Sequence, residues 1–120
     1  KCRNLYLNQG FQDTRGFHCD GRSLKFKSFV YISDVNKLDD GPYCYVKGSH
    51  RHRLLWRNNS TFNKENQLDP FEFSQLQASK AISIFAKAGD MVISSQKGAH
   101  CGHPQHPEAK RAVLVNMYQR

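Results

Sequence analysis

The amino-acid sequence predicts an all-β fold, a sandwich or barrel of short strands. Short runs rich in β-branched and aromatic residues recur along the chain, and polar and apolar side chains alternate within them. Clusters of Gly, Asp, Asn and Pro separate these runs and supply the turns between strands. A helical repeat of apolar residues is missing from most of the sequence, which favours a core closed by sheets.

Two strands are expected in the first third of the chain. Residues 3–9 alternate weakly, with Leu5 and Leu7 on one face. Residues 24–33 give the strongest strand signal, and their two faces differ because successive side chains point to opposite sides. One face is mostly apolar. The other combines lysine with aromatic side chains, as a pocket lining would: Lys25, Lys27, Phe29, Tyr31 and Ser33. Ordinary core packing explains Phe29 and Tyr31 equally well.

The middle of the chain contains one short strand and an insertion. A turn at Asp39-Asp40-Gly41-Pro42 precedes the strand at residues 43–46, and Gly48-Ser49 ends it. The strand pattern then lapses over residues 50–79, which we interpret as a loop or short helical insertion. Within it, Asp69-Pro70 is typical of the start of a helix, expected over residues 71–76.

The last third returns to strands, and turn residues delimit them. Gly89 and Asp90 form one turn, and a loop with two prolines precedes the last strand. The expected strands are residues 81–85, 91–94, 99–101 and 111–118.

Composition narrows the function classes. The chain has 120 residues, the size of one domain, and we assign residues 1–120 to it. Its net charge of +8 favours anionic ligands. The four scattered cysteines lack a CxxC pair, which favours a reducing compartment, the cytoplasm. No apolar run reaches the ~20 residues that cross a bilayer, so no membrane partner is expected. The basic run at 47–53 lacks interleaved aromatic residues, which argues against nucleic acid.

One pair of residues suggests a metal site. His18 and Asp20 are two residues apart, so an extended strand places both side chains on one face. Two histidines and a carboxylate form the facial triad of non-haem Fe(II) oxygenases, and a distant histidine could complete it. His100 is preferred because it lies at a strand end, whereas His103 and His106 lie in the following loop. A hydrogen-bonded His–Asp pair, or a zinc site built from the later histidines and Cys101, is the alternative.

Arg111 is a candidate for binding an anion. It shares a strand face with the apolar residues Val113, Val115 and Met117, so it is expected to point into the fold. Lys110 is the competing candidate for this role.

The order of these motifs resembles the phytanoyl-CoA dioxygenase family of Fe(II)/2-oxoglutarate oxygenases over residues 17–118. The resemblance rests on His18-x-Asp20, the segment from Gly41 to Arg51, Gly89-Asp90-Met91-Val92, His100, and an arginine eleven residues later. It implies a double-stranded β-helix, or jelly roll. It also implies Fe(II) held by His18, Asp20 and His100, and 2-oxoglutarate gripped through its far carboxylate by Arg111. O2 is the other co-substrate, and His50 belongs to a structural turn.

The chain also differs from the longer members of this family. Only 17 residues precede His18, so the helical region that braces the barrel of longer members is expected to be missing. Gly102 stands where some members carry a co-substrate contact, and Lys25, Tyr31 or Ser95 are candidates to replace it.

These observations lead to one main functional hypothesis and two rivals. The main hypothesis is a dioxygenase that hydroxylates a small molecule, and the positive charge favours an anionic one. It decarboxylates 2-oxoglutarate to succinate and CO2 in the same reaction. The first rival is a non-catalytic jelly-roll module that binds a metal or an anion. The second is a basic nucleic-acid-associated protein, for which salt-dependent binding to nucleic acid would be diagnostic.

Overall fold

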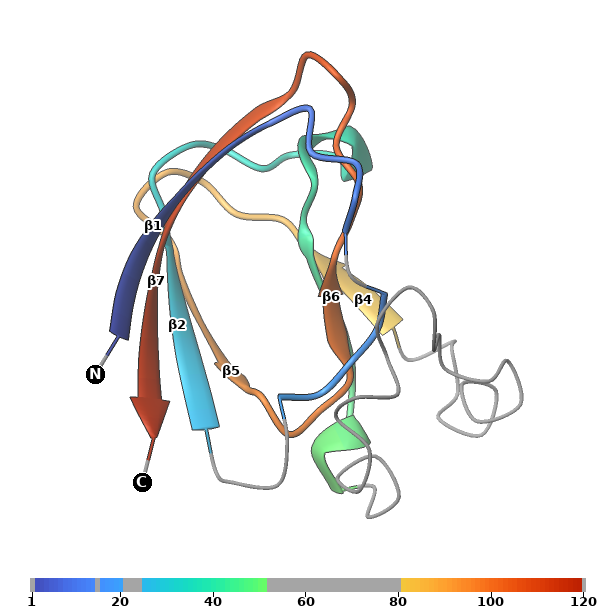
Figure 1. Cartoon of the computed structure of the whole chain (residues 1–120), viewed down its shortest axis with the longest axis vertical. Helices are drawn as coiled ribbons and strands as arrows, with labels where there is room; N and C mark the ends of the chain where they lie inside the picture. The colour runs from blue at the N-terminus through green and yellow to red at the C-terminus, as the bar shows by residue number, and fades with distance from the viewer. Residues whose placement is uncertain (1, 15, 21–24, 52–80, 120) are drawn as a thin grey trace.

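The computed structural model describes residues 2–14, 16–20, 25–51 and 81–119, and almost all of their regular structure is β-strand (Figure 1). The strands are β1 (Cys2–Gln9), β2 (Lys25–Tyr31), β3 (Tyr43–Val46), β4 (Ala81–Ile84), β5 (Met91–Ser95), β6 (His100–Gly102) and β7 (Lys110–Gln119). Two short 3-10 helices, η1 (Leu38–Asp40) and η2 (Ser49–Arg51), flank β3. Every strand expected from the sequence is therefore present, with ends that differ by at most two residues. The helix expected at 71–76 lies outside the described residues.

The strands form two antiparallel sheets that face each other as a sandwich. The larger sheet has the order β1-β7-β2-β5 and the smaller one the order β4-β3-β6. Figure 1 shows the four strands of the larger sheet on one side and β4 and β6 on the other. The all-β prediction is confirmed.

The core lies against the inner face of the larger sheet. In the register of β2 and β7, Phe29 lies opposite Val115 and Tyr31 opposite Val113. Tyr31, Val113 and Val115 are buried, and Phe29 packs against them. The two faces of β2 therefore differ as predicted, because the aromatic side chains of Phe29 and Tyr31 point into the core.

The outer face of the larger sheet is unusually apolar. Leu7 is 74% exposed and Leu5 55% on β1, and Ile93 is 65% and Met91 60% exposed on β5. Tyr6, between the two leucines, instead lines the interior cavity. None of the described helices is long and apolar enough to cross a membrane.

A glycine turn brings a backbone carbonyl into the site. Gly41 closes η1 with φ of +74°, a conformation that favours glycine. A Cβ at this position would also collide with the side chain of Gln105. The carbonyl of Gly41 accepts a hydrogen bond from Arg111 Nη1, so this turn fixes one end of the site.

Candidate metal and anion site

Backbone pairing brings the predicted metal ligands together, although about eighty residues separate them. The amide of His18 donates to the carbonyl of His100 at 2.9 Å, and the amide of His100 donates back at 2.8 Å. The amide of Asp20 donates to the carbonyl of Gln96 at 2.9 Å. His18 therefore forms an isolated β-bridge with His100 of β6, and the ring centroids of the two histidines are 4.4 Å apart.

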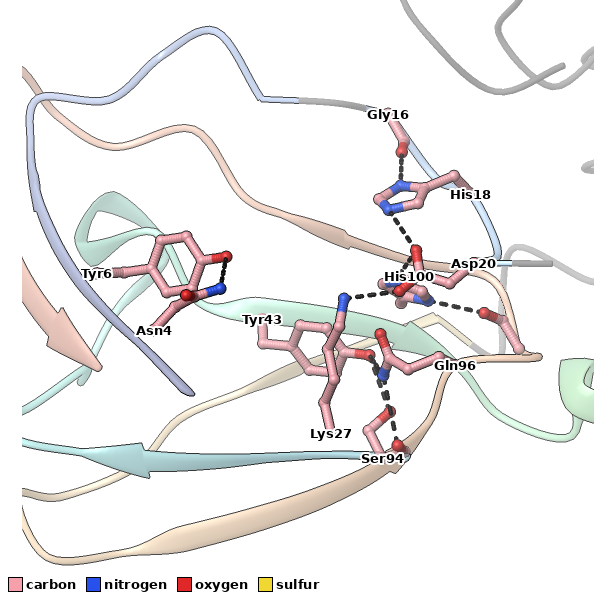
Figure 2. A network of polar contacts seen from close by, with 11 residues as sticks. Asn4, Tyr6, Gly16, His18, Asp20, Lys27, Tyr43, Ser94, Gln96 and His100 are labelled. Carbon is pink, nitrogen blue, oxygen red and sulfur yellow. Dashed lines mark hydrogen bonds and ion pairs between the residues drawn. The ribbon is translucent and has the colours of Figure 1, made fainter. Parts of the chain in front are cut away.

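The donor atoms of His18, Asp20 and His100 converge on one point (Figure 2). One donor atom from each residue lies within 4.8 Å of the others. Asp20 Oδ1 is 3.7 Å from Nε2 of His18 and 3.7 Å from Nε2 of His100. Among the described parts of the chain, this is the group of three ligand-type residues that could hold a metal ion.

The second ring nitrogen, Nδ1, fixes the orientation and the tautomer of each imidazole. His18 Nδ1 lies 2.8 Å from the carbonyl oxygen of Gly16, and His100 Nδ1 lies 2.9 Å from that of Gly98. A carbonyl only accepts, so each neutral ring carries its hydrogen on Nδ1 and its lone pair on Nε2. Metal-binding histidines are oriented in this way by their second nitrogen.

His100 has the clearest need for a further partner. It is only 3% exposed, and burial lowers its pKa to about 4, so the ring is neutral at neutral pH. Its buried Nε2 has no hydrogen-bond partner among the described residues. Leaving such an atom unsatisfied costs about 1–3 kcal/mol. A divalent cation would satisfy it, and two neutral imidazoles with one carboxylate are a suitable donor set for Fe(II). The residues present therefore fit the metal.

Lys27 holds the other oxygen of the Asp20 carboxylate. Its Nζ donates to Oδ2 at 2.7 Å, which leaves Oδ1 facing the histidines. Burial raises the pKa of Asp20, but the hydrogen bond and charge of Lys27 outweigh it, and the pKa lies below its usual value. Lys27 lies on the β2 face predicted to line a pocket, but nothing in the sequence assigned it this contact.

The triad opens into a cavity of about 360 Å³ between the sheets. His18, His100 and Lys27 line one part of it, and Arg111 lines another. The remaining lining residues are mostly aromatic or apolar: Tyr6, Phe29, Tyr31, Tyr43, Gln96, Cys101, Gly102, Val113 and Val115. Neither Lys25 nor Ser95 is among them, whereas Tyr31 is.

Arg111 is a largely enclosed cation whose donors are only partly used. Besides the bond to Gly41, its Nη2 donates to Asn8 Oδ1 at 3.2 Å. Among the described residues, its buried Nε has no hydrogen-bond acceptor and no carboxylate forms an ion pair with it. Burial lowers its pKa, but a guanidinium stays charged in proteins. Such a group favours an anionic ligand in the cavity. Lys110, the competing candidate, is exposed.

Tyr43, Ser94 and Gln96 form a hydrogen-bonded group beside the cavity, which the sequence did not predict. Tyr43 Oη lies 2.8 Å from Ser94 Oγ, and Gln96 Nε2 donates to Tyr43 Oη at 3.3 Å. Burial raises the pKa of Tyr43, which therefore stays protonated. Gln96 is 1% exposed, and its Oε1 has no partner among the described residues. Tyr43 lies on β3, Ser94 on β5 and Gln96 directly after β5. Residues so far apart in the sequence form no local pattern that would predict these contacts.

The loop histidines take no part in the triad. His103 Nδ1 bonds to the adjacent carbonyl of Pro104 at 2.8 Å, and His106 is exposed. The alternative zinc site from the later histidines and Cys101 is not among the metal-competent groups of the described residues.

Comparisons with known proteins find the fold but no close relative. No protein-family model matches the sequence, and no curated protein matches it significantly. HygX from Streptomyces hygroscopicus, solved with nickel and 2-oxoglutarate bound, has a TM-score of 0.69 and 16% identity over 98% of this chain and 54% of its own. Another HygX structure also contains hygromycin B.

Two further solved structures share the fold. The nickel complex of ThoJ, a non-heme monooxygenase, has a TM-score of 0.67 and 17% identity over 98% of this chain and 42% of its own. EctD from S. alaskensis in its apoform has a TM-score of 0.74 and 16% identity over 98% of this chain and 43% of its own. The chain thus spans about half the length of the structures it matches, and at these identities the likeness shows the fold alone.

Proposed function

We propose that the chain is the core of an Fe(II)/2-oxoglutarate-dependent dioxygenase that hydroxylates a small molecule. His18, Asp20 and His100 hold Fe(II), and Arg111 binds the far carboxylate of 2-oxoglutarate. One observation carries the proposal. Two imidazole nitrogens and a carboxylate oxygen converge within 4.8 Å in a cavity that also contains a guanidinium without a protein carboxylate partner among the described residues. Membership of the phytanoyl-CoA dioxygenase family and a double-stranded β-helix belong to the same proposal.

Each residue has a defined task in this reaction. When bound, the iron together with 2-oxoglutarate and O2 supplies the oxidative decarboxylation to succinate and CO2 and the coupled hydroxylation. His18 and His100 contribute neutral donors and Asp20 one negative charge, which leaves positions for the co-substrates. Arg111 offers parallel hydrogen-bond donors that match a carboxylate. Apolar lining residues such as Val113 and Val115 limit the access of water to the cavity between the triad and Arg111.

The substrate class follows from charge and size. The net charge of +8 favours an anionic small molecule. HygX, which has the same fold, holds the small molecule hygromycin B together with nickel and 2-oxoglutarate. No nucleic-acid or membrane partner is part of the proposal, and we assign the protein to the cytoplasm.

An anaerobic titration with Fe(II) and 2-oxoglutarate tests the proposal. The wild type is expected to give the weak visible charge-transfer band of an iron–2-oxoglutarate chelate. His100→Ala should abolish the band, and Arg111→Ala should move it to much higher 2-oxoglutarate concentrations. Lys110→Ala, the exposed neighbour on β7, is the matched control and should leave the titration unchanged. A folded wild type that gives no band would exclude the dioxygenase.

A non-catalytic binding module is the second candidate. It is favoured by the site itself, because the triad and the guanidinium of Arg111 would bind a metal and an anion without any turnover. Under this alternative the visible band forms, but adding O2 yields no succinate. Measuring succinate after aerobic incubation of the same samples therefore separates the two candidates.

A further inference from the structure

Two cysteines face each other behind the metal site. Cys44 on β3 and Cys101 on β6 are directly opposite in the antiparallel register. Two residues further along in each direction, the amide of Val46 donates to the carbonyl of Ala99 and the amide of His103 donates to the carbonyl of Pro42, both at 2.9 Å. Hydrogen-bonded pairs recur at every second residue of an antiparallel ladder, so Cys44 and Cys101 also form a hydrogen-bonded pair, for which the Cα atoms lie about 5.5 Å apart. Disulfides form across Cα separations of about 4.4–6.8 Å, so the backbone already has the required spacing.

The two side chains are in contact and reachable. The thiol of Cys101 hydrogen-bonds with Cys44 Sγ. Both are nearly buried, at 6% and 9% exposed, but both line a surface cavity next to Phe17 and Pro104. Cys19, by contrast, is completely buried. A small oxidant or reductant can therefore approach the Cys44–Cys101 pair from outside the smaller sheet.

The local environment favours a thiolate at Cys44. The hydrogen bond from Cys101 is the main cause, and burial opposes it. Ser83 Oγ, 3.5 Å from Cys44 Sγ, and the positive charge of Arg111 add to the effect. Together they lower the pKa of Cys44 to about 6.

We propose that Cys44 and Cys101 form a reversible disulfide, a redox-sensitive modification site on the strand that carries His100. With hydrogen peroxide as oxidant, the thiolate of Cys44 attacks one peroxide oxygen and breaks the O–O bond. Cys44 becomes a sulfenic acid, and the leaving hydroxide takes up a proton to give water. The sulfur of Cys101 then attacks the sulfenic sulfur, and the hydroxyl group departs with the Cys101 proton as a second water. Two thiols and one peroxide thus give one disulfide and two waters.

Such a bridge is compatible with a reducing compartment. Disulfides in the cytosol are usually transient, and those within a sheet are readily reduced when their geometry is strained. The bridge would covalently join β3 to β6, which is only three residues long and carries His100. This inference does not depend on the proposed dioxygenase activity, because it rests on the strand register and the surroundings of the two cysteines.

Peptide mapping of peroxide-treated protein tests the inference. The protein is oxidised in its native state, remaining thiols are blocked during denaturation, and the tryptic digest is analysed by mass spectrometry. We expect residues 38–47 and 98–110 to appear as one linked species, about 2 Da lighter than the two free peptides together, and to separate after dithiothreitol. Cys44→Ser and Cys101→Ser should lose the linked species, whereas Cys2→Ser and Cys19→Ser should retain it.

Three results would overturn the proposal. The first is a wild type in which both peptides stay reduced under conditions that oxidise a control dithiol. The second is a stable sulfenic acid on Cys44, trapped by dimedone, without a bridge. The third is a bridge that involves Cys2, Cys19 or a second molecule. The wild-type map decides among them by itself, so the test does not rely on a variant that might fold poorly.

Discussion

Replacing His100 by asparagine should remove metal binding while preserving the local fold. The asparagine amide nitrogen can take the place of Nδ1 and still donate to the carbonyl of Gly98, now bonded to the ring at 2.9 Å. Nothing in asparagine replaces Nε2, the donor that faces Asp20 Oδ1 at 3.7 Å. The substitution therefore deletes one of three ligand atoms and little else.

The expected size of the effect follows from linkage. A metal present at 100 times its Kd stabilises the folded state by about 2.7 kcal/mol. Unfolding entropy is about 2.1 cal/mol/K per residue, or about 0.25 kcal/mol/K for 120 residues, so the Tm should rise by about 11 °C. Losing only a hydrogen-bond partner of a ligand weakens metal binding about 10- to 100-fold. Losing the ligand itself should cost at least about 100-fold, which leaves a rise of about 2 °C.

Thermal unfolding with and without Fe(II), measured anaerobically against a chelator baseline, checks this prediction. Each variant is compared with its own metal-free form, so a loss of intrinsic stability cancels. His103→Asn is the matched control, since its ring bonds to a neighbouring carbonyl and stays outside the triad. The reasoning is refuted if His100→Asn keeps the full shift, or if His103→Asn loses it.

Three further predictions address the charges around the triad. Arg111→Met should raise the 2-oxoglutarate concentration needed for half-saturation by about 100-fold, because a charge-assisted contact of about 3 kcal/mol is lost. The Fe(II)-induced Tm shift should stay unchanged. Equal weakening of 2-oxoglutarate binding and Fe(II) binding would contradict the role assigned to Arg111. Lys27→Met should raise the pKa of Asp20, so Fe(II) binding should fade at a higher pH than in the wild type, whereas Lys25→Met should behave as wild type in the same pH series. In metal-free protein, burial lowers the pKa of His100 from 6.5 to about 4. Only the unfolded chain binds a proton there between these values, so stability should fall by on the order of 3 kcal/mol as the pH drops from 6.5 to 4. Urea unfolding of the wild type and of His100→Asn across this range measures the difference, and identical pH profiles would count against it.

The strands could be predicted because their signals are local. Alternation in residues 24–33 and the turn at Gly89 depend only on neighbours in sequence, and both are found in the structure. The same holds for the inward direction of Arg111, which follows from the pleat of β7 and its apolar neighbours.

Contacts between strands could not be predicted in the same way. The bond from Lys27 to Asp20 joins β2 to the segment beside β6, and the group around Gln96 joins the two sheets. The pairing of Cys44 with Cys101 depends on the register of strands from distant parts of the chain. A shift by one residue would turn each of these side chains to the other face, so no local pattern specifies them.

Consecutive residues on β6 point in opposite directions, so one short strand serves two sites. His100 pairs with Tyr45 and lines the inner cavity, whereas Cys101 pairs with Cys44, and these two cysteines line the surface cavity. A bridge closing a loop of about 60 residues would stabilise the fold by at most about 4 kcal/mol, less any strain. His100 is already held by two backbone hydrogen bonds to His18, so the bridge should leave its position unchanged. We therefore expect the oxidised protein to unfold at a higher temperature but to show the same Fe(II)-induced shift as the reduced protein. A changed shift would mean that disulfide and metal are coupled, and by reciprocity Fe(II) would then alter the ease of reduction by the same factor.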